Sequence, residues 1–183
     1  MLSRFSSLYA IVNPFIQICL LRQAPQDLPA SGILLAITLT AQTVMSILLL
    51  GNASLGAVNA VVWGLLDTVL LVVLTGALLY VSRHIARITQ TVTALAGTGA
   101  IITFIALPIY GWLHGVDQAA GEGGFALLLL LILAGWSLAV AGHIFRHALS
   151  LPSYFLGLAL AMALYLISWF STWAFKALFP LGA

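Results

Sequence analysis

The sequence predicts an all-α protein, a polytopic membrane helix bundle of about five transmembrane helices preceded by an N-terminal interfacial helix. Of its 183 residues, 63% are hydrophobic and only 5% are charged. Soluble domains carry about 25% charged residues, so most of this surface suits lipid better than water. The apolar residues also form five long runs, each of about 20 residues or more, which is enough to cross a bilayer core of about 30 Å.

Residues 1–28 are predicted to form a separate N-terminal interfacial segment. Their apolar stretch is interrupted at Asn13-Pro14 and is too short to span the membrane. We therefore expect one or two short helices lying at the membrane surface, with Phe5, Tyr9 and Phe15 dipping into the acyl region. A polar connector rich in proline follows this segment.

Residues 29–183 are predicted to form a transmembrane domain of five helices. The turns between the runs contain glycine, proline or charged residues, which interrupt helices. The expected spans cover residues 30–50, 55–81, 91–112, 125–145 and 152–175. Pro152 suits the first turn of the last span, and Pro108 is able to kink the end of the third.

The positions of the basic residues predict a cytoplasmic N-terminus. With five spans, the segments that precede the first, third and fifth spans lie on one side of the membrane. They contain the five arginines of the chain, Arg4, Arg22, Arg83, Arg87 and Arg146. Cytoplasmic loops are enriched in lysine and arginine, so this side is expected to be cytoplasmic. Only Lys176 falls on the opposite side, and a lysine at a helix end can reach the interface.

Asp67 and Thr68 form a candidate intramembrane polar site near the middle of the second expected span. A charged side chain there costs about 2.5–3.5 kcal/mol on insertion scales, and no lysine or arginine is predicted at that depth. We therefore expect a mostly neutral acid that faces the bundle interior and hydrogen-bonds to polar side chains. The possible partners besides Thr68 are Thr38, Thr40, Gln42, Thr103 and Ser137. Two interpretations stay open, a polar clamp between helices and a proton or cation site.

A basic and histidine cluster is predicted on the cytoplasmic side. Its members are Arg83, His84, Arg87, His143, Arg146 and His147. His143 and His147 are four residues apart and so share a helix face, but zinc sites use three or four protein ligands. A surface that meets lipid phosphates or a partner is therefore favoured over a metal or haem site, and we expect no metal and no cofactor.

Small residues predict close contacts between helices. The glycines expected at such contacts are Gly97, Gly111, Gly115, Gly135 and Gly142. Such faces favour packing with other membrane proteins or with a second copy of the chain.

One pattern resembles a known family. The Asn13-Pro14 pair, the connector with Pro25 and Pro29, and the five spans resemble the Yip (Ypt-interacting protein) family of five-span membrane proteins. Two later passages are also similar to that family, Gly135-Trp136-Ser137-Leu138 and Arg146-His147-Ala148-Leu149. In eukaryotic members the family implies vesicle traffic through small GTPases. Those members have a long polar N-terminal region, whereas this chain has about 28 residues there, and its short loops imply a bacterial inner-membrane relative.

The residues favour a protein without catalytic machinery. No serine–histidine–acid set, phosphate loop or dinucleotide motif is present in the sequence, so no catalytic residue is assigned. The net charge of +2 is scattered and gives no case for nucleic acid. The first hypothesis is a scaffold or accessory subunit that packs with lipids and other membrane proteins. The alternative is a small transporter or channel-like protein that uses Asp67.

Overall fold

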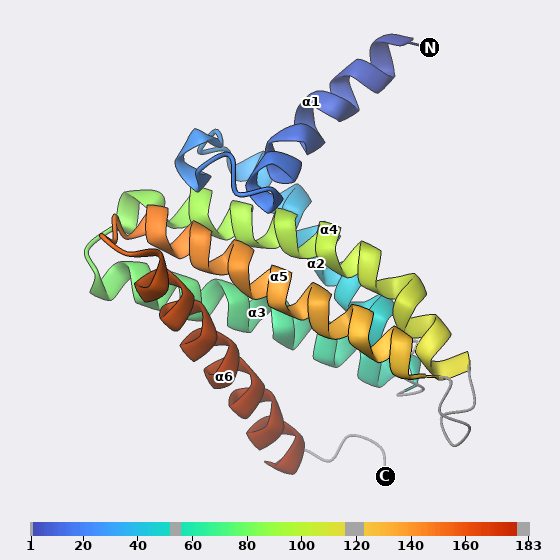
Figure 1. The fold of residues 1–183 in the computed structure, drawn as a ribbon. Coiled ribbons are helices and arrows are strands. Elements are labelled where there is room, and N and C mark those ends of the chain that lie inside the picture. Colours follow the sequence, from blue (N-terminus) through green and yellow to red (C-terminus); the bar gives the residue numbers. More distant parts are fainter. Residues whose placement is uncertain (1, 52–55, 116–122, 179–183) are drawn as a thin grey trace.

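The computed structural model describes residues 2–51, 56–115 and 123–178, with side chains from Ile11 onward. All regular elements in this part of the chain are helical (Figure 1). The helices are α1 (Leu2–Cys19), α2 (Gly32–Gly51), α3 (Ala57–Val81), α4 (Ile88–Gly115), α5 (Gly124–Ala148) and α6 (Tyr154–Leu178), with short 3-10 turns η1 (Pro25–Asp27) and η2 (Ile85–Arg87). The predicted all-α class is confirmed.

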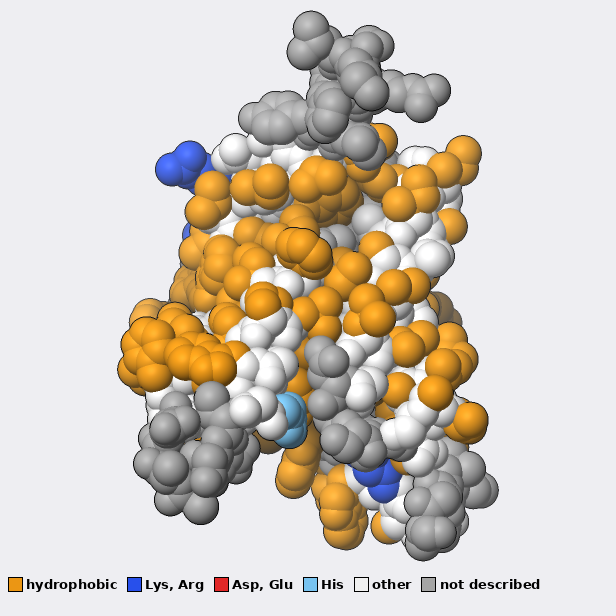
Figure 2. Space-filling model, turned by 90° about the vertical axis from the view of Figure 1, so that its right-hand side faces the viewer, with side chains coloured by type: hydrophobic (Ala, Val, Ile, Leu, Met, Phe, Trp, Pro, Cys, Tyr) orange, Lys and Arg blue, Asp and Glu red, His pale blue; other side chains and the backbone are white. Residues whose placement is uncertain are grey.

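Five of these helices, α2 to α6, are long and apolar enough to cross a membrane. Their bounds lie within a few residues of the predicted spans. The largest difference is in α4, which runs past Pro108 to Gly115. Helix α6 begins at Tyr154, so Pro152 precedes its first turn. The chain is therefore an integral, multi-pass membrane protein, and Figure 2 shows a face made mostly of hydrophobic side chains with Lys and Arg near its ends.

Helix α4 lies at the centre of the bundle and α6 at its edge. In α4, 44% of an apolar stretch of 18 residues is buried inside the protein, whereas in α6 the share is 11%. Small residues such as Ala94, Gly97 and Ala100 line the buried surface of α4, which lets neighbouring helices approach closely. Helix α6 starts beside the end of α5 and then leaves it at an angle (Figure 1). The space between α6 and the bundle is where the candidate site lies.

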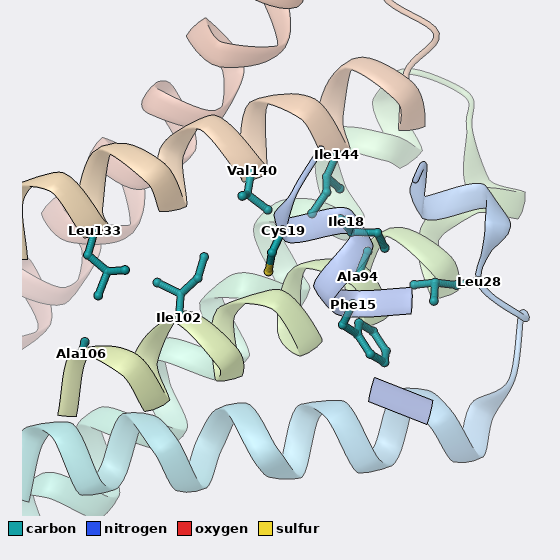
Figure 3. Close-up of a cluster of buried hydrophobic side chains, with 10 residues drawn as sticks. All are labelled: Phe15, Ile18, Cys19, Leu28, Ala94, Ile102, Ala106, Leu133, Val140 and Ile144. Atoms are coloured by element: carbon teal, nitrogen blue, oxygen red, sulfur yellow. The ribbon is translucent and has the colours of Figure 1, made fainter. Parts of the chain in front are cut away.

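The C-terminal end of α1 is inserted into the bundle. Phe15, Ile18 and Cys19 of α1 are buried in one hydrophobic cluster with residues of α4 and α5 (Figure 3). This differs from the sequence-based expectation, which placed Phe15 among acyl chains. Phe15 is only 4% exposed, because its ring packs against Gly97 of α4. It occupies the space that a side chain at Gly97 would need. The α1 helix is also continuous through Asn13-Pro14, while the side chains of Phe5 and Tyr9 lie outside the described residues.

Hydrogen bonds hold the connector between α1 and α2 against the bundle. Trp136 Nε1 donates to the carbonyl of Cys19 at 2.9 Å. Gln90 Nε2 donates to the carbonyl of Leu28 at 2.6 Å, and Gln26 Nε2 donates to that of His147 at 2.6 Å. Buried and half-buried carbonyls are thereby paired. The connector is consequently part of the folded domain.

Cys19, the one cysteine of the chain, is predicted to be unreactive in the folded protein. Burial raises the pKa of its thiol to about 11, so the thiolate, the reactive form, is scarce at neutral pH. Labelling by a water-soluble maleimide is expected to be slow in mild detergent and fast after unfolding in dodecyl sulfate. Equal rates in the two states would show that α1 does not pack as described.

Candidate intramembrane acid site

Asp67 lies near the middle of α3 and is half-buried. Ser46 Oγ of α2 donates a hydrogen bond of 3.0 Å to Asp67 Oδ2. Gln42 Nε2 in turn donates to Ser46 Oγ at 3.3 Å. One turn away, the hydroxyls of Thr43 and Thr68 share a hydrogen bond of 2.8 Å. The acid thus stands at the end of a polar chain that joins α2 to α3.

The local sequence of α2 explains this arrangement. Its buried residues are Thr38, Gln42 and Ser46, all polar and each four residues from the next. Residues at this spacing share one helix face, so α2 turns its polar face inward and its apolar residues outward. This is the expected inversion of a soluble helix, because a polar side chain is costly in lipid. The inward face of α2 supplies Asp67 with its hydrogen-bond donor.

The other side of Asp67 borders a cavity of about 110 Å³ between α3, α4, α5 and α6. The polar residues among its walls are Asp67, Thr75, Tyr165 and Ser168, and the remaining walls are leucine, alanine and phenylalanine. The hydroxyl of Tyr165 is 2.9 Å from Ser137 Oγ of α5 and hydrogen-bonded to it. No lysine, arginine or histidine is among the described residues that line this cavity.

The arrangement allows two chemical states of the acid. A neutral carboxyl can donate a hydrogen bond while it accepts the one from Ser46, and this state has no charge to desolvate. A carboxylate can persist only if a cation in the cavity offsets the cost of its burial. The site can therefore hold a proton or a cation, but no described side chain on the cavity wall supplies the positive charge.

A second polar feature lies at the contact between α2 and α4. Gln42 is 7% exposed, and its Oε1 is buried without a hydrogen-bond partner among the described residues. A Cβ built at Gly99 would lie 2.8 Å from this oxygen. Glycine at this position therefore gives the Gln42 amide the space that it needs beside Ser46.

The predicted basic and histidine cluster is divided among separate bonds at one end of the bundle. Arg87 Nη1 donates to the carbonyl of Ala148 at 2.8 Å and to Ser150 Oγ at 2.8 Å. It thereby supplies a hydrogen-bond donor to a carbonyl at the C-terminal end of α5. His143 Nε2 donates to the carbonyl of Gln23 at 3.0 Å. His84 Nδ1 donates to a carbonyl of its own turn.

His143 and His147 lie side by side but have no further metal ligands around them among the described residues. The rings of His143 and His147 lie 4.5 Å apart between centroids, as their spacing along one helix face predicts. Among the described residues, no group of three or more His, Cys, Asp or Glu side chains could hold a metal ion. Arg83 and Arg146 lie at the same end of the bundle, beside the ends of α3 and α5.

The five predicted packing glycines fall into two groups. A Cβ at Gly97 would collide with Phe15, and one at Gly142 would lie 3.0 Å from Leu158 Cα of α6. At Gly111, Gly115 and Gly135 nothing lies within 4 Å. These two groups cannot be separated from the sequence, because glycine spacing alone does not identify the facing helix.

Sequence reasoning missed five polar residues of the site. They are Ser46, the direct donor to Asp67, Thr43, which bonds to Thr68, and Thr75, Tyr165 and Ser168 on the cavity wall. The four-residue spacing of Thr38, Gln42 and Ser46 was a signal that could have found Ser46. A scan against models of protein families found no match to the chain, and searches of curated proteins and of solved structures found none either.

Proposed function

We propose that this membrane protein is a small transporter that uses Asp67 to bind a proton or a cation inside the membrane. The observation that carries the proposal is the cavity of about 110 Å³ that Asp67 borders. A carboxyl group used only to hold helices together needs no open space beside it. A carboxyl group that exchanges its proton for a cation needs room for that cation and polar groups to accompany it, which Tyr165 and Ser168 supply.

The cost of an acid at this depth supports the same proposal. An intramembrane acid is expensive to keep, and in membrane proteins such residues commonly mark ion pathways. A hydroxyl or amide at position 67 would accept the bond from Ser46 at lower cost. We take the acid to be present because its proton is used.

A second candidate is a scaffold or accessory subunit that packs with other membrane proteins or with a second copy, without enzymatic activity. The observation that favours it is the pair of adjacent bonds between α2 and α3, Ser46 to Asp67 at 3.0 Å and Thr43 to Thr68 at 2.8 Å. Hydrogen bonds across helices stabilise membrane bundles by about 0.6 kcal/mol on average. In this role Asp67 is a clamp.

Two substitutions at Asp67 distinguish these candidates. Asp67→Leu is expected to lower the free energy of unfolding by about 1–3 kcal/mol in both, because Ser46 loses its partner. Asp67→Asn keeps the hydrogen bond and is expected to leave stability nearly unchanged. Infrared difference spectra over a pH series should show a carboxyl band that titrates in the wild type and is missing in Asp67→Asn. A folded protein without such a titrating band would contradict the transporter and leave the clamp.

Orientation and origin belong to the same proposal. Four arginines lie in the segments that precede α2, α4 and α6: Arg22, Arg83, Arg87 and Arg146. We propose that this end is cytoplasmic and that the protein lies in a bacterial inner membrane. The resemblance to the Yip family stays a prediction.

Charge reversal tests the orientation. Arg87 pairs backbone carbonyls at the end of α5, so its loss changes folding as well as charge, whereas no such bond is described for Arg83. Arg83→Glu is expected to weaken the cytoplasmic retention of the α3–α4 turn in a reporter-fusion assay, and Arg83→Glu with Arg87→Glu is expected to weaken it more. An unchanged reporter pattern in the double variant would contradict the N-in orientation.

A further inference from the structure

We infer that the ligand of the Asp67 cavity is a small organic ammonium ion, which binds in exchange for the proton of Asp67. This inference rests on the proposed function and names its substrate class. It follows from the volume of the cavity, from the chemistry of its walls and from the number of acids that face it.

The volume limits the ligand to a small molecule. The cavity measures about 110 Å³, and an apolar cavity of about 150 Å³ holds benzene. A short alkylammonium ion fits wholly in this space, whereas a nucleotide, a sugar or a peptide would leave most of its atoms outside it. The cavity is also larger than a single bare metal ion requires.

The walls favour an organic cation over a hydrated metal ion. Hard cations such as Ca²⁺ and Mg²⁺ take about six or more oxygen ligands, and few of the residues that line this cavity carry a side-chain oxygen. Leu71, Leu164 and Phe145 offer apolar contact to an alkyl chain instead. The rings of Phe145 and Tyr165 can also attract a positive charge. An ammonium group beside Asp67 with its carbon chain toward these side chains satisfies both kinds of wall.

The charges around Asp67 determine the exchange. From α2 the facing groups are the neutral Ser46 and Gln42, and from α6 the titratable group is Tyr165. Lys176, also of α6, lies 4.9 Å above the ring of Trp63, one turn before Asp67 on α3, and is not among the residues that line the cavity. The basic groups of the turn η2 and of α4 and α5 lie in the turn or toward the helix ends: Arg87, His114, His143, Arg146 and His147.

A single acid in this setting cannot hold a proton and an ammonium ion at once. The neutral acid and the free cation give a carboxylate paired with the bound cation and one released proton. The only covalent bond that breaks is the O–H bond of Asp67, and its proton goes to water. The net charge of the site stays the same, because one cation enters for each proton that leaves.

Calorimetry on the full chain in mild detergent tests the exchange. The probes are n-propylammonium chloride, sodium chloride and the uncharged 1-propanol, each titrated in two buffers of different protonation enthalpy. We expect n-propylammonium to bind with release of about one proton and an affinity that rises up to about tenfold per pH unit while Asp67 is protonated. Asp67→Asn is expected to lose both binding and proton release. Thr40→Val, a change on the outward face of α2, is the matched control and is expected to keep both.

A second variant keeps the test valid if Asp67→Asn folds poorly. Leu164→Trp fills the cavity from its α6 wall and leaves Asp67 and its donor Ser46 unchanged, and is expected to abolish ammonium binding while the infrared titration of Asp67 persists. Sodium binding with proton release, but no ammonium binding, would overturn the inference and leave the proposed function. Equal binding of 1-propanol by the wild type and Asp67→Asn would overturn the inference as well. No titration of Asp67 and no binding of either cation would overturn both.

Discussion

Gly142→Leu is expected to lower the free energy of unfolding by about 3 kcal/mol, toward the upper end of what overpacking costs. A Cβ at Gly142 would lie 3.0 Å from Leu158 Cα and 3.1 Å from its backbone nitrogen. Because these are backbone atoms, a larger side chain must displace the whole of α6. Across the same contact, a Cβ at Gly157 would collide with the carbonyl of Gly142. The backbones of α5 and α6 therefore approach closely here, next to the cavity-lining residues Ala141 and Ala161.

The chain offers a control on the same helix. Gly135 lies seven residues before Gly142, and nothing lies within 4 Å of a Cβ built there. Gly135→Leu is expected to leave stability within about 0.5 kcal/mol of the wild type, as a typical surface change does. Both variants can be compared by unfolding in dodecyl sulfate from mild detergent. Equal losses in the two variants would contradict the described contact of α5 with α6.

Phe15→Ala is expected to cost about 3–5 kcal/mol, the range for a large buried aromatic side chain. Phe15 is 4% exposed and packs against α4 at Gly97. Removal of the ring leaves a cavity at a position where glycine offers no side chain to fill it. The loss should also loosen α1 and the connector that follows it.

Ile16→Ala is the matched control for Phe15. It is the next residue on the same helix, it is 38% exposed, and its change should cost much less. Faster maleimide labelling of Cys19 in Phe15→Ala, but not in Ile16→Ala, would show that α1 has come loose. Equal effects of the two substitutions would support a helix at the membrane surface, which is what the sequence alone predicts for this segment.

The spanning helices were predictable because their signal is local. A run of apolar residues long enough to cross the hydrocarbon core needs a helix whatever its neighbours are, and α2 to α6 follow that rule. The position of Phe15 was not predictable in this way. It depends on Gly97, which is far away in the sequence and leaves space on α4 for an aromatic ring. The sequence shows both residues but not their pairing.

The candidate site was predictable in part for the same reason. A lone acid in an apolar run identifies Asp67 as a costly residue, and its depth restricts its partners to polar groups of other spans. The choice of Ser46 depends on how α2 is rotated toward α3. The cavity depends on the angle at which α6 leaves α5. Both are properties of packing between helices, which a single sequence without facing partners does not specify.

Proton flux in proteoliposomes tests the central claim, exchange at Asp67, most directly. Vesicles with the reconstituted protein and an internal pH dye are given an inward gradient of n-propylammonium at equal pH, and the early change of internal pH is compared with that of protein-free vesicles, which reports leakage of the neutral amine. The proposal predicts that internal pH rises faster than in protein-free vesicles for the wild type and for Thr40→Val, because protons leave in exchange for the cation. In Asp67→Asn it should rise at the same rate as in protein-free vesicles. Flux at the leakage rate in a wild-type protein whose stability shows it to be folded would contradict the proposal.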